Sequence, residues 1–200
     1  MIEKIENHLN GFLSESREFS TLSHSLQEKL KKWDDEKTSI ERPRWKYYFL
    51  AMANLVSLRS PDGRTKTGCV LVDQNNSILG TGYNGPIRGV DDRILPNFDK
   101  SKYPFFQHAE MNCLLNCARQ GIKTASSIIY ITGPPCFNCV QSLYQAGISK
   151  VIHGKQYIHM MDNQDYKDNM ELFNFLTQKN MPLIEVDFDR DKLKELLGVI

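Results

Sequence analysis

The sequence predicts an α/β fold: a three-layer α/β/α sandwich built around a mixed five-stranded sheet, with an N-terminal helical extension. Two observations lead to this prediction. After residue 42, apolar stripes with helical spacing alternate with short apolar runs of strand character. A short turn joins the first two runs, which predicts an antiparallel hairpin, whereas helices separate the later runs, which predicts parallel crossovers.

The first 41 residues differ from the rest because they are rich in Glu, Lys and Ser and contain no Pro. Their apolar residues form two sets at helical spacing, which predicts two amphipathic helices. The sets are Ile2, Ile5, Leu9, Phe12 and Leu13, then Phe19, Leu22, Leu26, Leu30 and Trp33. Pro43 marks a boundary, so we expect a helical extension over 1–41 and a main domain over 42–200. The extension is either a hairpin packed on its own domain or an arm for regulation or assembly.

The main domain is predicted to begin with a helix from Trp45. Strands are expected at residues 69–72, 78–83, 127–132, 150–153 and 183–188. Further helices are expected at residues 111–121, 137–147, 168–178 and 192–197. The stretch from Gly85 to Gln107 contains three prolines and is predicted to be a long loop. A loop of that length inside a compact domain is usually functional.

Composition excludes several classes of protein. With 40% apolar and 24% charged residues, the 200-residue chain is expected to be globular rather than disordered. The net charge of +1 gives no basic excess, which argues against nucleic acid as a partner. No apolar run is long enough to cross a membrane, and the N-terminus lacks the apolar region of a secretory signal. We therefore expect a cytoplasmic protein with no membrane partner.

The five cysteines point to a reduced protein with a metal site. An odd number of cysteines in a chain of this length argues against a disulfide scaffold. We interpret Cys69, Cys113 and Cys117 as small buried apolar residues, because they fall in strand and helix patterns with no nearby histidine in register. Cys136 and Cys139 form the only C-x-x-C of the chain.

Two short motifs carry the chemistry, and each opens a predicted helix. They are His108-Ala109-Glu110 and Pro134-Pro135-Cys136-Phe137-Asn138-Cys139. Two thiolates and one imidazole give zinc three protein ligands and leave one tetrahedral position open, which is typical of a catalytic rather than a structural site. Cys113 should point away from this group, since it lies five residues along the helix from His108.

Glu110 is the candidate for proton transfer. It lies two residues after His108, close enough to reach the open position without being a ligand. A zinc ion with two thiolates and a neutral imidazole has no net charge and acidifies water less than one held by three imidazoles. A nearby carboxylate can take the proton of that water and deliver it to the substrate.

The order His-x-Glu, then Pro-Cys-x-x-Cys, is the signature of zinc-dependent nucleobase deaminases. From about Trp45 to Gly154 the chain resembles the deoxycytidylate (dCMP) deaminases in particular, because a long loop containing Asp-Asp, Leu-Pro and Lys-Tyr-Pro precedes the histidine. The matching stretches are Arg59-Ser60, Thr65-Lys66-Thr67-Gly68-Cys69, Gly82-Tyr83-Asn84-Gly85-Pro86, Gly89-Val90-Asp91-Asp92, Leu95-Pro96, Lys102-Tyr103-Pro104, His108-Ala109-Glu110-Met111-Asn112 and Gln145-Ala146-Gly147-Ile148-Ser149-Lys150-Val151-Ile152.

This resemblance implies a sandwich of the cytidine-deaminase type and the reaction of dCMP with water to give dUMP and ammonia, which supplies dUMP for thymidylate synthesis. It implies that His108, Cys136 and Cys139 bind zinc and that Glu110 shuttles protons. Asn84 would hydrogen-bond the sugar. The resemblance also implies a homo-oligomer, a hexamer or a dimer, regulated by the effectors dCTP and dTTP. Residues 86–107 lack the Cys and His of a second zinc site, so we expect one zinc per chain.

The substrate phosphate needs cations or oriented N–H groups. Arg59 and Lys66 are the candidates, since both flank the strand that precedes Asn84. Ala109 and Pro135, next to the expected ligands, complete the expected substrate-binding residues, and Pro135 is expected to fix the approach to Cys136.

The sequence departs from the family at two places. Pro61 and Gly63 alter the usual Ser-Lys-Asp-Pro loop, and Tyr157 is followed by Ile158-His159 where Tyr-His-Asp is common. Two alternatives therefore stay open. One is a deaminase of another cytosine compound: dCTP, deoxycytidine, a modified dCMP or a base in single-stranded nucleic acid. The other is a non-catalytic zinc-containing binding protein.

Overall fold

The structure of the chain, a computed structural model, describes residues 24–35, 42–156, 164–177 and 180–197. The chain divides into two units, Met1–Arg42 and Pro43–Ile200. Within the first unit, helix α3 spans His24–Asp35, in the region where the second amphipathic stripe predicts a helix. The other predicted N-terminal helix lies outside the described residues. The second unit contains the sheet and all residues discussed below.

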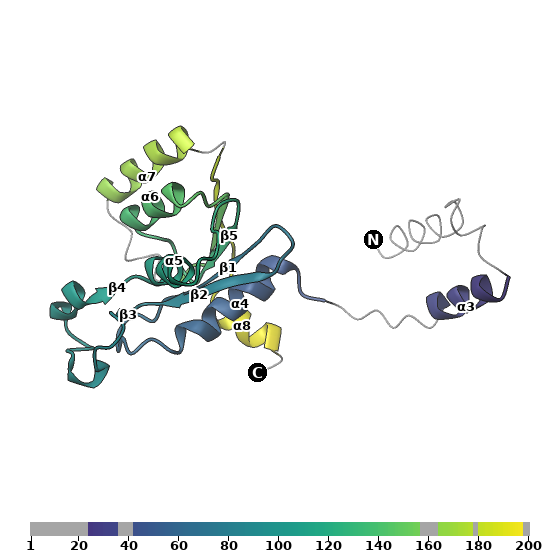
Figure 1. Cartoon of the computed structure of the whole chain (residues 1–200), viewed down its shortest axis with the longest axis horizontal. Helices are drawn as coiled ribbons and strands as arrows, with labels where there is room; N and C mark the ends of the chain where they lie inside the picture. Colours follow the sequence, from purple (N-terminus) through teal and green to yellow (C-terminus); the bar gives the residue numbers. More distant parts are fainter. Residues whose placement is uncertain (1–23, 36–41, 157–163, 178–179, 198–200) are drawn as a thin grey trace. The chain divides into compact units, whose positions relative to one another are not determined.

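A mixed five-stranded sheet forms the centre of the second unit (Figure 1). Its strands are β1 (Gly68–Val72), β2 (Ile78–Tyr83), β5 (Ile128–Ile131), β6 (Lys150–His153) and β7 (Leu183–Glu185), in the order β2-β1-β5-β6-β7. Strand β1 is antiparallel to both β2 and β5, whereas β5, β6 and β7 are parallel. The predicted hairpin followed by crossovers is confirmed.

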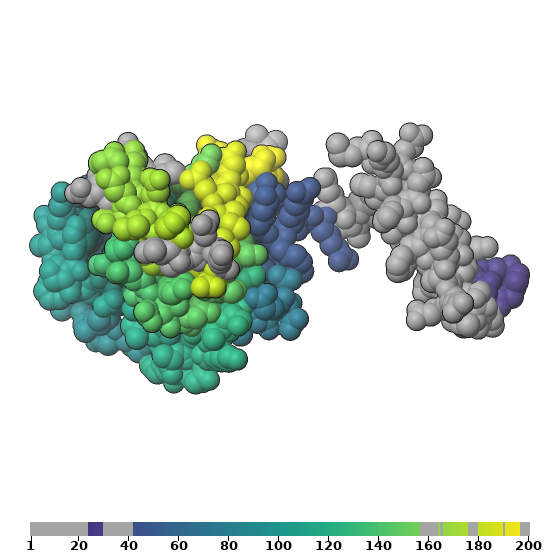
Figure 2. Space-filling view, turned by 90° about the horizontal axis from the view of Figure 1, so that it is seen from above, coloured from purple at the N-terminus to yellow at the C-terminus, as the bar shows by residue number. Residues whose placement is uncertain are grey.

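Helices cover both faces of the sheet and complete the three layers. One face carries α4 (Trp45–Ser57) and α8 (Arg190–Leu197); the other carries α5 (Ala109–Gln120), α6 (Phe137–Gln145) and α7 (Gln164–Thr177). In the space-filling view the C-terminal residues, in yellow, lie beside the blue helix α4 (Figure 2). Of the helices that the structure describes, none combines the length and the apolar character needed to cross a membrane.

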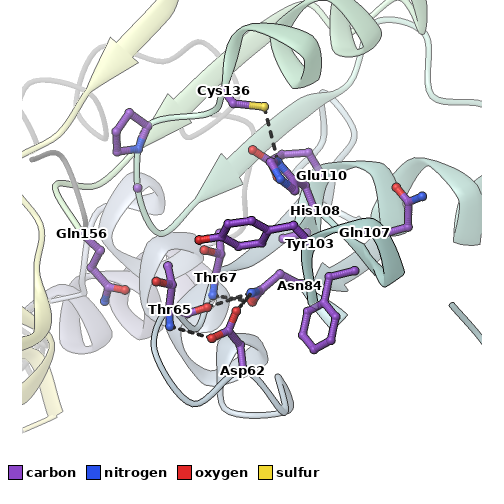
Figure 3. A pocket seen from close by; sticks show the side chains of 14 residues that line it. Asp62, Thr65, Thr67, Asn84, Tyr103, Gln107, His108, Glu110, Cys136 and Gln156 are labelled. Atoms are coloured by element: carbon purple, nitrogen blue, oxygen red, sulfur yellow. Dashed lines mark hydrogen bonds between the residues drawn. The ribbon is translucent and has the colours of Figure 1, made fainter. Parts of the chain in front are cut away.

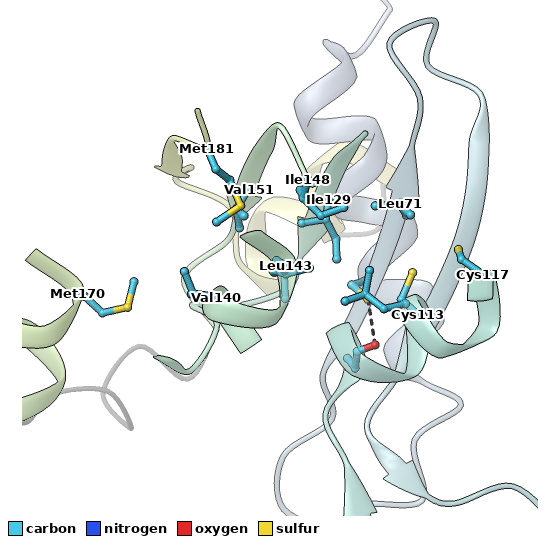
Figure 4. Close-up of a cluster of buried hydrophobic side chains, with 14 residues drawn as sticks. Leu71, Cys113, Cys117, Ile129, Val140, Leu143, Ile148, Val151, Met170 and Met181 are labelled. Atoms are coloured by element: carbon cyan, nitrogen blue, oxygen red, sulfur yellow. Dashed lines mark hydrogen bonds between the residues drawn. The ribbon is translucent and has the colours of Figure 1, made fainter. Parts of the chain in front are cut away.

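The two faces of the sheet bury different side chains because residues alternate along each strand. Val70 and Val72 of β1 pack with α4, while Cys69 and Leu71 pack with α5 and α6. The second cluster is drawn in Figure 4.

Cys69, Cys113 and Cys117 belong to this second cluster and have no exposed surface, and they are free thiols. Burial raises the pKa of Cys69. The interpretation of these three as buried apolar residues is confirmed.

The segment from Gly85 to Gln107 is more ordered than the predicted loop. It contains the 3-10 helices η1 (Asp92–Ile94) and η2 (Lys100–Phe105), and it is closed at its base by pairing of β3 (Gly85–Pro86) with β4 (Phe106–Gln107). The carboxylates of Asp91 and Asp99 cap the two 3-10 helices by accepting hydrogen bonds from N–H groups two residues on. A two-residue strand has no periodicity, so no sequence pattern could indicate this pairing.

Close packing of β2 on α5 sets the position of the residues that follow His108. A Cβ atom added at Gly82 would lie 2.1 Å from the carbonyl oxygen of Ala109 and 2.6 Å from the backbone nitrogen of Cys113. Both are backbone atoms of α5 and cannot move aside independently. Glycine at position 82 therefore allows the first turn of α5 to approach the sheet.

We predict that Gly82→Ala lowers the free energy of unfolding by more than about 3 kcal/mol, because α5 must move away from β2. Gly85→Ala is the matched control: a Cβ atom there meets its nearest neighbour, Pro61 Cδ, at 3.4 Å, an ordinary contact, so a loss of about 1 kcal/mol or less is expected. Urea unfolding of both variants measures the difference. Equal losses would contradict this account.

Candidate active site

The residues of the two motifs lie at the N-termini of adjacent helices. His108 is the N-cap of α5 and Cys136 is the N-cap of α6; both have extended backbones, and neither side chain caps its own helix. Cys139 is the third residue of α6. The free N–H groups and the positive ends of the helix dipoles at these positions favour thiolates over thiols.

The three donor atoms form one compact group. Nδ1 of His108 lies 3.3 Å from Sγ of Cys136 and 3.4 Å from Sγ of Cys139, and all three donor atoms lie within 4.8 Å of one another. Zinc with ordinary bond lengths and tetrahedral angles places a nitrogen and a sulfur ligand about 3.6 Å apart. The side chains present therefore fit zinc in donor type and spacing. Within the described ranges, no other His, Cys, Asp or Glu side chains form such a group.

Protonation of this group follows from its contacts. Hydrogen bonds from the Cys139 thiol and from His108 lower the pKa of Cys136 to about 4. The hydrogen bond between the two cysteines also raises the pKa of Cys139, so the proton they share stays on Cys139. The contact with Cys136 also raises the pKa of His108. A thiolate is therefore already favoured at the first cysteine, and metal binding would displace the remaining proton.

Glu110 lies beside this group on the first turn of α5 and is only 3% exposed. Burial raises the pKa of its carboxyl group. A carboxyl group in this setting can hold a proton as well as accept one, which is what general acid–base catalysis needs.

The group opens into a cavity of about 450 Å³, a size typical of small-molecule sites. Figure 3 shows His108, Glu110 and Cys136 at one end, with Asp62, Thr65, Thr67 and Asn84 at the other and the Tyr103 ring between them. The cavity is lined by Asp62, Thr65, Thr67, Asn84, Tyr103, Phe106, Gln107, His108, Ala109, Glu110, Gly133, Pro134, Cys136 and Gln156.

Of the expected substrate-binding residues, Asn84 and Ala109 line this cavity. Lys66 lines an adjoining cavity of about 550 Å³ together with Arg64, and its Nζ donates to the carbonyl oxygen of Ser60 at 2.6 Å. Asp62 and Gln156 line both cavities.

Arg59 and Pro135 are placed elsewhere. Arg59 is exposed at the surface and does not line either cavity, and Pro134 rather than Pro135 lines the first one. The carbonyl oxygen of Pro135 accepts a hydrogen bond from the Tyr166 hydroxyl at 2.7 Å. This contact holds the backbone immediately before Cys136, so Pro135 contributes to the site through its backbone.

Several lining residues were not expected from the sequence. Asp62, Thr65, Thr67 and Gln156 come from loops with no periodic pattern, and Lys102 is buried behind the lining with Asp62. The one available signal was that Thr65, Thr67 and Lys102 fall within stretches that match the deoxycytidylate deaminases.

We predict that Cys136→Ala removes zinc from the protein, because two remaining ligands cannot hold the ion against dialysis. Cys113→Ala is the control: Cys113 is also a free cysteine but lies in the core, so this variant should keep about one zinc per chain. Elemental analysis after dialysis against a weak chelator gives the stoichiometry. Zinc retained in Cys136→Ala, or lost in Cys113→Ala, would contradict the assignment.

Comparisons with known proteins agree with this geometry. The model of the cytidine and deoxycytidylate deaminase zinc-binding region matches residues 43–155. The ComE operon protein 2 of Bacillus subtilis is 32% identical over 173 residues, covering 80% of this chain and 85% of that protein. The human deoxycytidylate deaminase is 36% identical over 124 residues, covering 59% of this chain and 68% of the human protein.

Solved structures include the dCMP deaminase from the cyanophage S-TIM5 in complex with dCMP and dUMP. It superposes with a TM-score of 0.57 and 27% sequence identity, over 73% of this chain and 99% of the phage chain. The matched family region covers more than half of the present chain and contains both motifs. The chain therefore belongs to the cytidine and deoxycytidylate deaminases, a family of hydrolytic enzymes with a zinc-binding region.

Proposed function

We propose that this protein hydrolyses dCMP to dUMP and ammonia. The observation that carries the proposal is the meeting of a His/Cys/Cys donor group and a buried carboxyl group, Glu110, at one end of a single cavity. The names of the human and phage relatives support dCMP as the substrate.

His108, Cys136 and Cys139 would hold one zinc ion per chain. When bound, zinc supplies a water of lowered pKa that serves as the nucleophile. Glu110 would act as the proton carrier: its carboxylate would accept a proton from the attacking water and deliver it to N3 of the cytosine ring, and would then carry the second proton of that water to the amino group. A bond from oxygen to C4 forms, the bond from C4 to the amino nitrogen breaks, and ammonia leaves.

The remaining walls of the cavity orient the nucleotide. Tyr103 and Phe106 offer aromatic faces for the pyrimidine ring, and Ala109 leaves room beside the donor group. Asn84, at the far end, hydrogen-bonds the sugar. These contacts place C4 of the base at the donor group and direct the phosphate away from it.

The phosphate extends into the adjoining cavity, where Lys66 and Arg64 supply positive charge. Three carboxylates, Asp62, Asp189 and Asp191, line the same cavity. Asp62 is paired with Lys102, so Lys66 and Arg64 balance the charges of the other two. Arg59 is exposed and lines neither cavity, so we assign the phosphate to Lys66 and Arg64 instead.

We propose a homo-oligomer, controlled by dCTP and dTTP, that supplies dUMP for thymidylate synthesis in the cytoplasm. Exposed apolar side chains on the segment after Pro86 support assembly, notably Ile94 at 76% and Phe98 at 73% exposure. The five free cysteines support a reducing compartment.

We expect zinc-loaded protein to release ammonia from dCMP faster than from deoxycytidine, CMP or dCTP. Each substrate is assayed alone and with added dCTP or dTTP, and uracil formation is followed by absorbance. Faster turnover of another cytosine compound would support deamination as the reaction but contradict dCMP as the substrate. Absence of turnover on every substrate would favour a non-catalytic binding protein.

Glu110→Gln is expected to lower kcat for dCMP by about 10³-fold while zinc content stays unchanged, because the amide cannot carry protons. Glu185→Gln is the matched control: Glu185 is an exposed glutamate at the end of β7, and this change should leave kcat within about twofold. Kinetics and elemental analysis of the same preparations test both expectations. A Glu110→Gln enzyme that retains turnover would exclude Glu110 as the proton carrier.

A further inference from the structure

A buried ion pair stands at the wall of the cavity opposite the donor group: Asp62 lines the cavity and Lys102 lies next to it. Lys102 Nζ is 2.5 Å from Oδ1 of Asp62, and the two side chains are 2% and 4% exposed. The ammonium also donates to the carbonyl oxygen of Asn97 at 3.0 Å and lies 5.9 and 5.7 Å from the ring centres of Tyr103 and Phe106. Both rings line the cavity. The pair therefore joins the segment before α5 to the loop before β1.

Stability alone does not account for such a pair. The free energy needed to remove two charges from water is about as large as the free energy gained from their attraction. Apolar residues of similar size at such positions often give a protein of equal stability. The contacts of the carboxylate point to a different use.

The Asp62 carboxylate organises its surroundings through both oxygens. Oδ1 accepts hydrogen bonds from the backbone N–H groups of Arg64 at 2.8 Å and Thr65 at 2.9 Å. Oδ2 accepts from Nδ2 of Asn84 at 3.1 Å. One buried carboxylate thus shapes the loop before β1 and contacts the residue that follows β2, as Figure 3 shows.

These contacts fix the orientation of the Asn84 amide. Its Nδ2 donates to Asp62 and to the carbonyl oxygen of Thr65 at 2.7 Å, and its Oδ1 accepts from the backbone N–H of Thr67 at 2.7 Å. Both amide hydrogens are therefore used, and only one lone pair of Oδ1 stays available. In this orientation Asn84 can accept a hydrogen bond from a ligand hydroxyl group but cannot donate one to a phosphate or carbonyl oxygen.

The carboxylate also brings a negative charge to the wall of a cavity proposed to bind an anion. At about 10 Å in a medium of effective dielectric constant about 20, one uncompensated charge changes the affinity for an anion by about tenfold for each unit of charge on that anion. The Lys102 ammonium is in contact with the carboxylate and cancels this field.

We propose that Asp62 is a positioning residue that holds Asn84 as a hydrogen-bond acceptor for a sugar hydroxyl, and that Lys102 makes its carboxylate compatible with a phosphorylated ligand. This inference rests on the proposed function for the identity of the ligand. It assigns separate effects to the two partners: Asp62 acts on the binding of nucleoside and nucleotide alike, and Lys102 acts on the preference for the nucleotide.

The test is binding of dUMP and of deoxyuridine to zinc-loaded protein by calorimetry at pH 8. Lys102→Met leaves the carboxylate uncompensated, and dUMP carries about two negative charges at pH 8, so affinity for dUMP should fall about a hundredfold more than affinity for uncharged deoxyuridine. Arg93→Met is the matched control. It breaks the exposed Arg93–Asp91 ion pair of the same segment, so both affinities should stay within about twofold.

The double variant Asp62→Asn/Lys102→Met tests positioning separately and keeps the proposal testable if the single variant fails to fold. It has no uncompensated buried charge, so the wild-type preference for dUMP over deoxyuridine should return. An asparagine at position 62 has only one side-chain oxygen. If that oxygen keeps the hydrogen bonds from the loop N–H groups, the new NH2 group faces the NH2 group of Asn84; if it accepts from Asn84, the loop N–H groups lose their acceptor. Both affinities should therefore fall about tenfold, with zinc content unchanged.

Equal losses for dUMP and deoxyuridine in Lys102→Met would overturn the role of Lys102. Wild-type affinities in the double variant would overturn the role of Asp62. Binding of dUMP does not require turnover. Wild-type protein that binds dUMP but does not deaminate dCMP would therefore contradict the proposed function only. The affinities of the variants would still decide whether Asp62 and Lys102 act as proposed.

Discussion

The site depends on two helix N-termini being held next to each other. Helix α5 supplies the histidine and α6 the two cysteines, and the imidazole and thiol groups come within 3.4 Å only because both helices pack on the same face of the sheet. The close approach of β2 to α5 at Gly82 and the short connection from β5 to α6 leave little freedom in this arrangement. The chemistry is thus a product of rigid packing rather than of mobile loops.

The charges of the site are arranged from one end of the cavity to the other. At the metal end, a buried carboxyl group stands beside sulfur and nitrogen donors, where burial favours its protonated form. At the far end, a second buried carboxylate is paired with an ammonium and hydrogen-bonded by three N–H donors. Two buried carboxyl groups in one cavity therefore stand in different surroundings, and our proposals assign them different roles, proton transfer for Glu110 and positioning for Asp62.

The sheet, the helices and the donor group could be predicted from local patterns. The helix from Trp45 was predicted with its correct start because its apolar residues recur at helical spacing, and the strand at residues 150–153 was predicted with its correct bounds. The cavity wall could not be predicted: Asp62 lies in a loop and Lys102, 40 residues later, in the short 3-10 helix η2, neither has an apolar periodicity, and only tertiary folding brings them together. Likewise, which of two adjacent prolines lines the cavity depends on backbone geometry, and it is Pro134 rather than Pro135.

Pairing of β3 with β4 separates the segment after Pro86 from the donor group. The two-residue ladder joins Gly85 to Gln107 and Pro86 to Phe106, so it closes the segment one residue before His108. Changes at the exposed positions of this segment, such as Ile94 and Phe98, need not shift the start of α5. The fold thus separates the exposed part of this segment from the donor group. Through Tyr103 the same segment forms part of the cavity wall, so a change in this segment can alter which ligands fit while the geometry of the donor group stays the same.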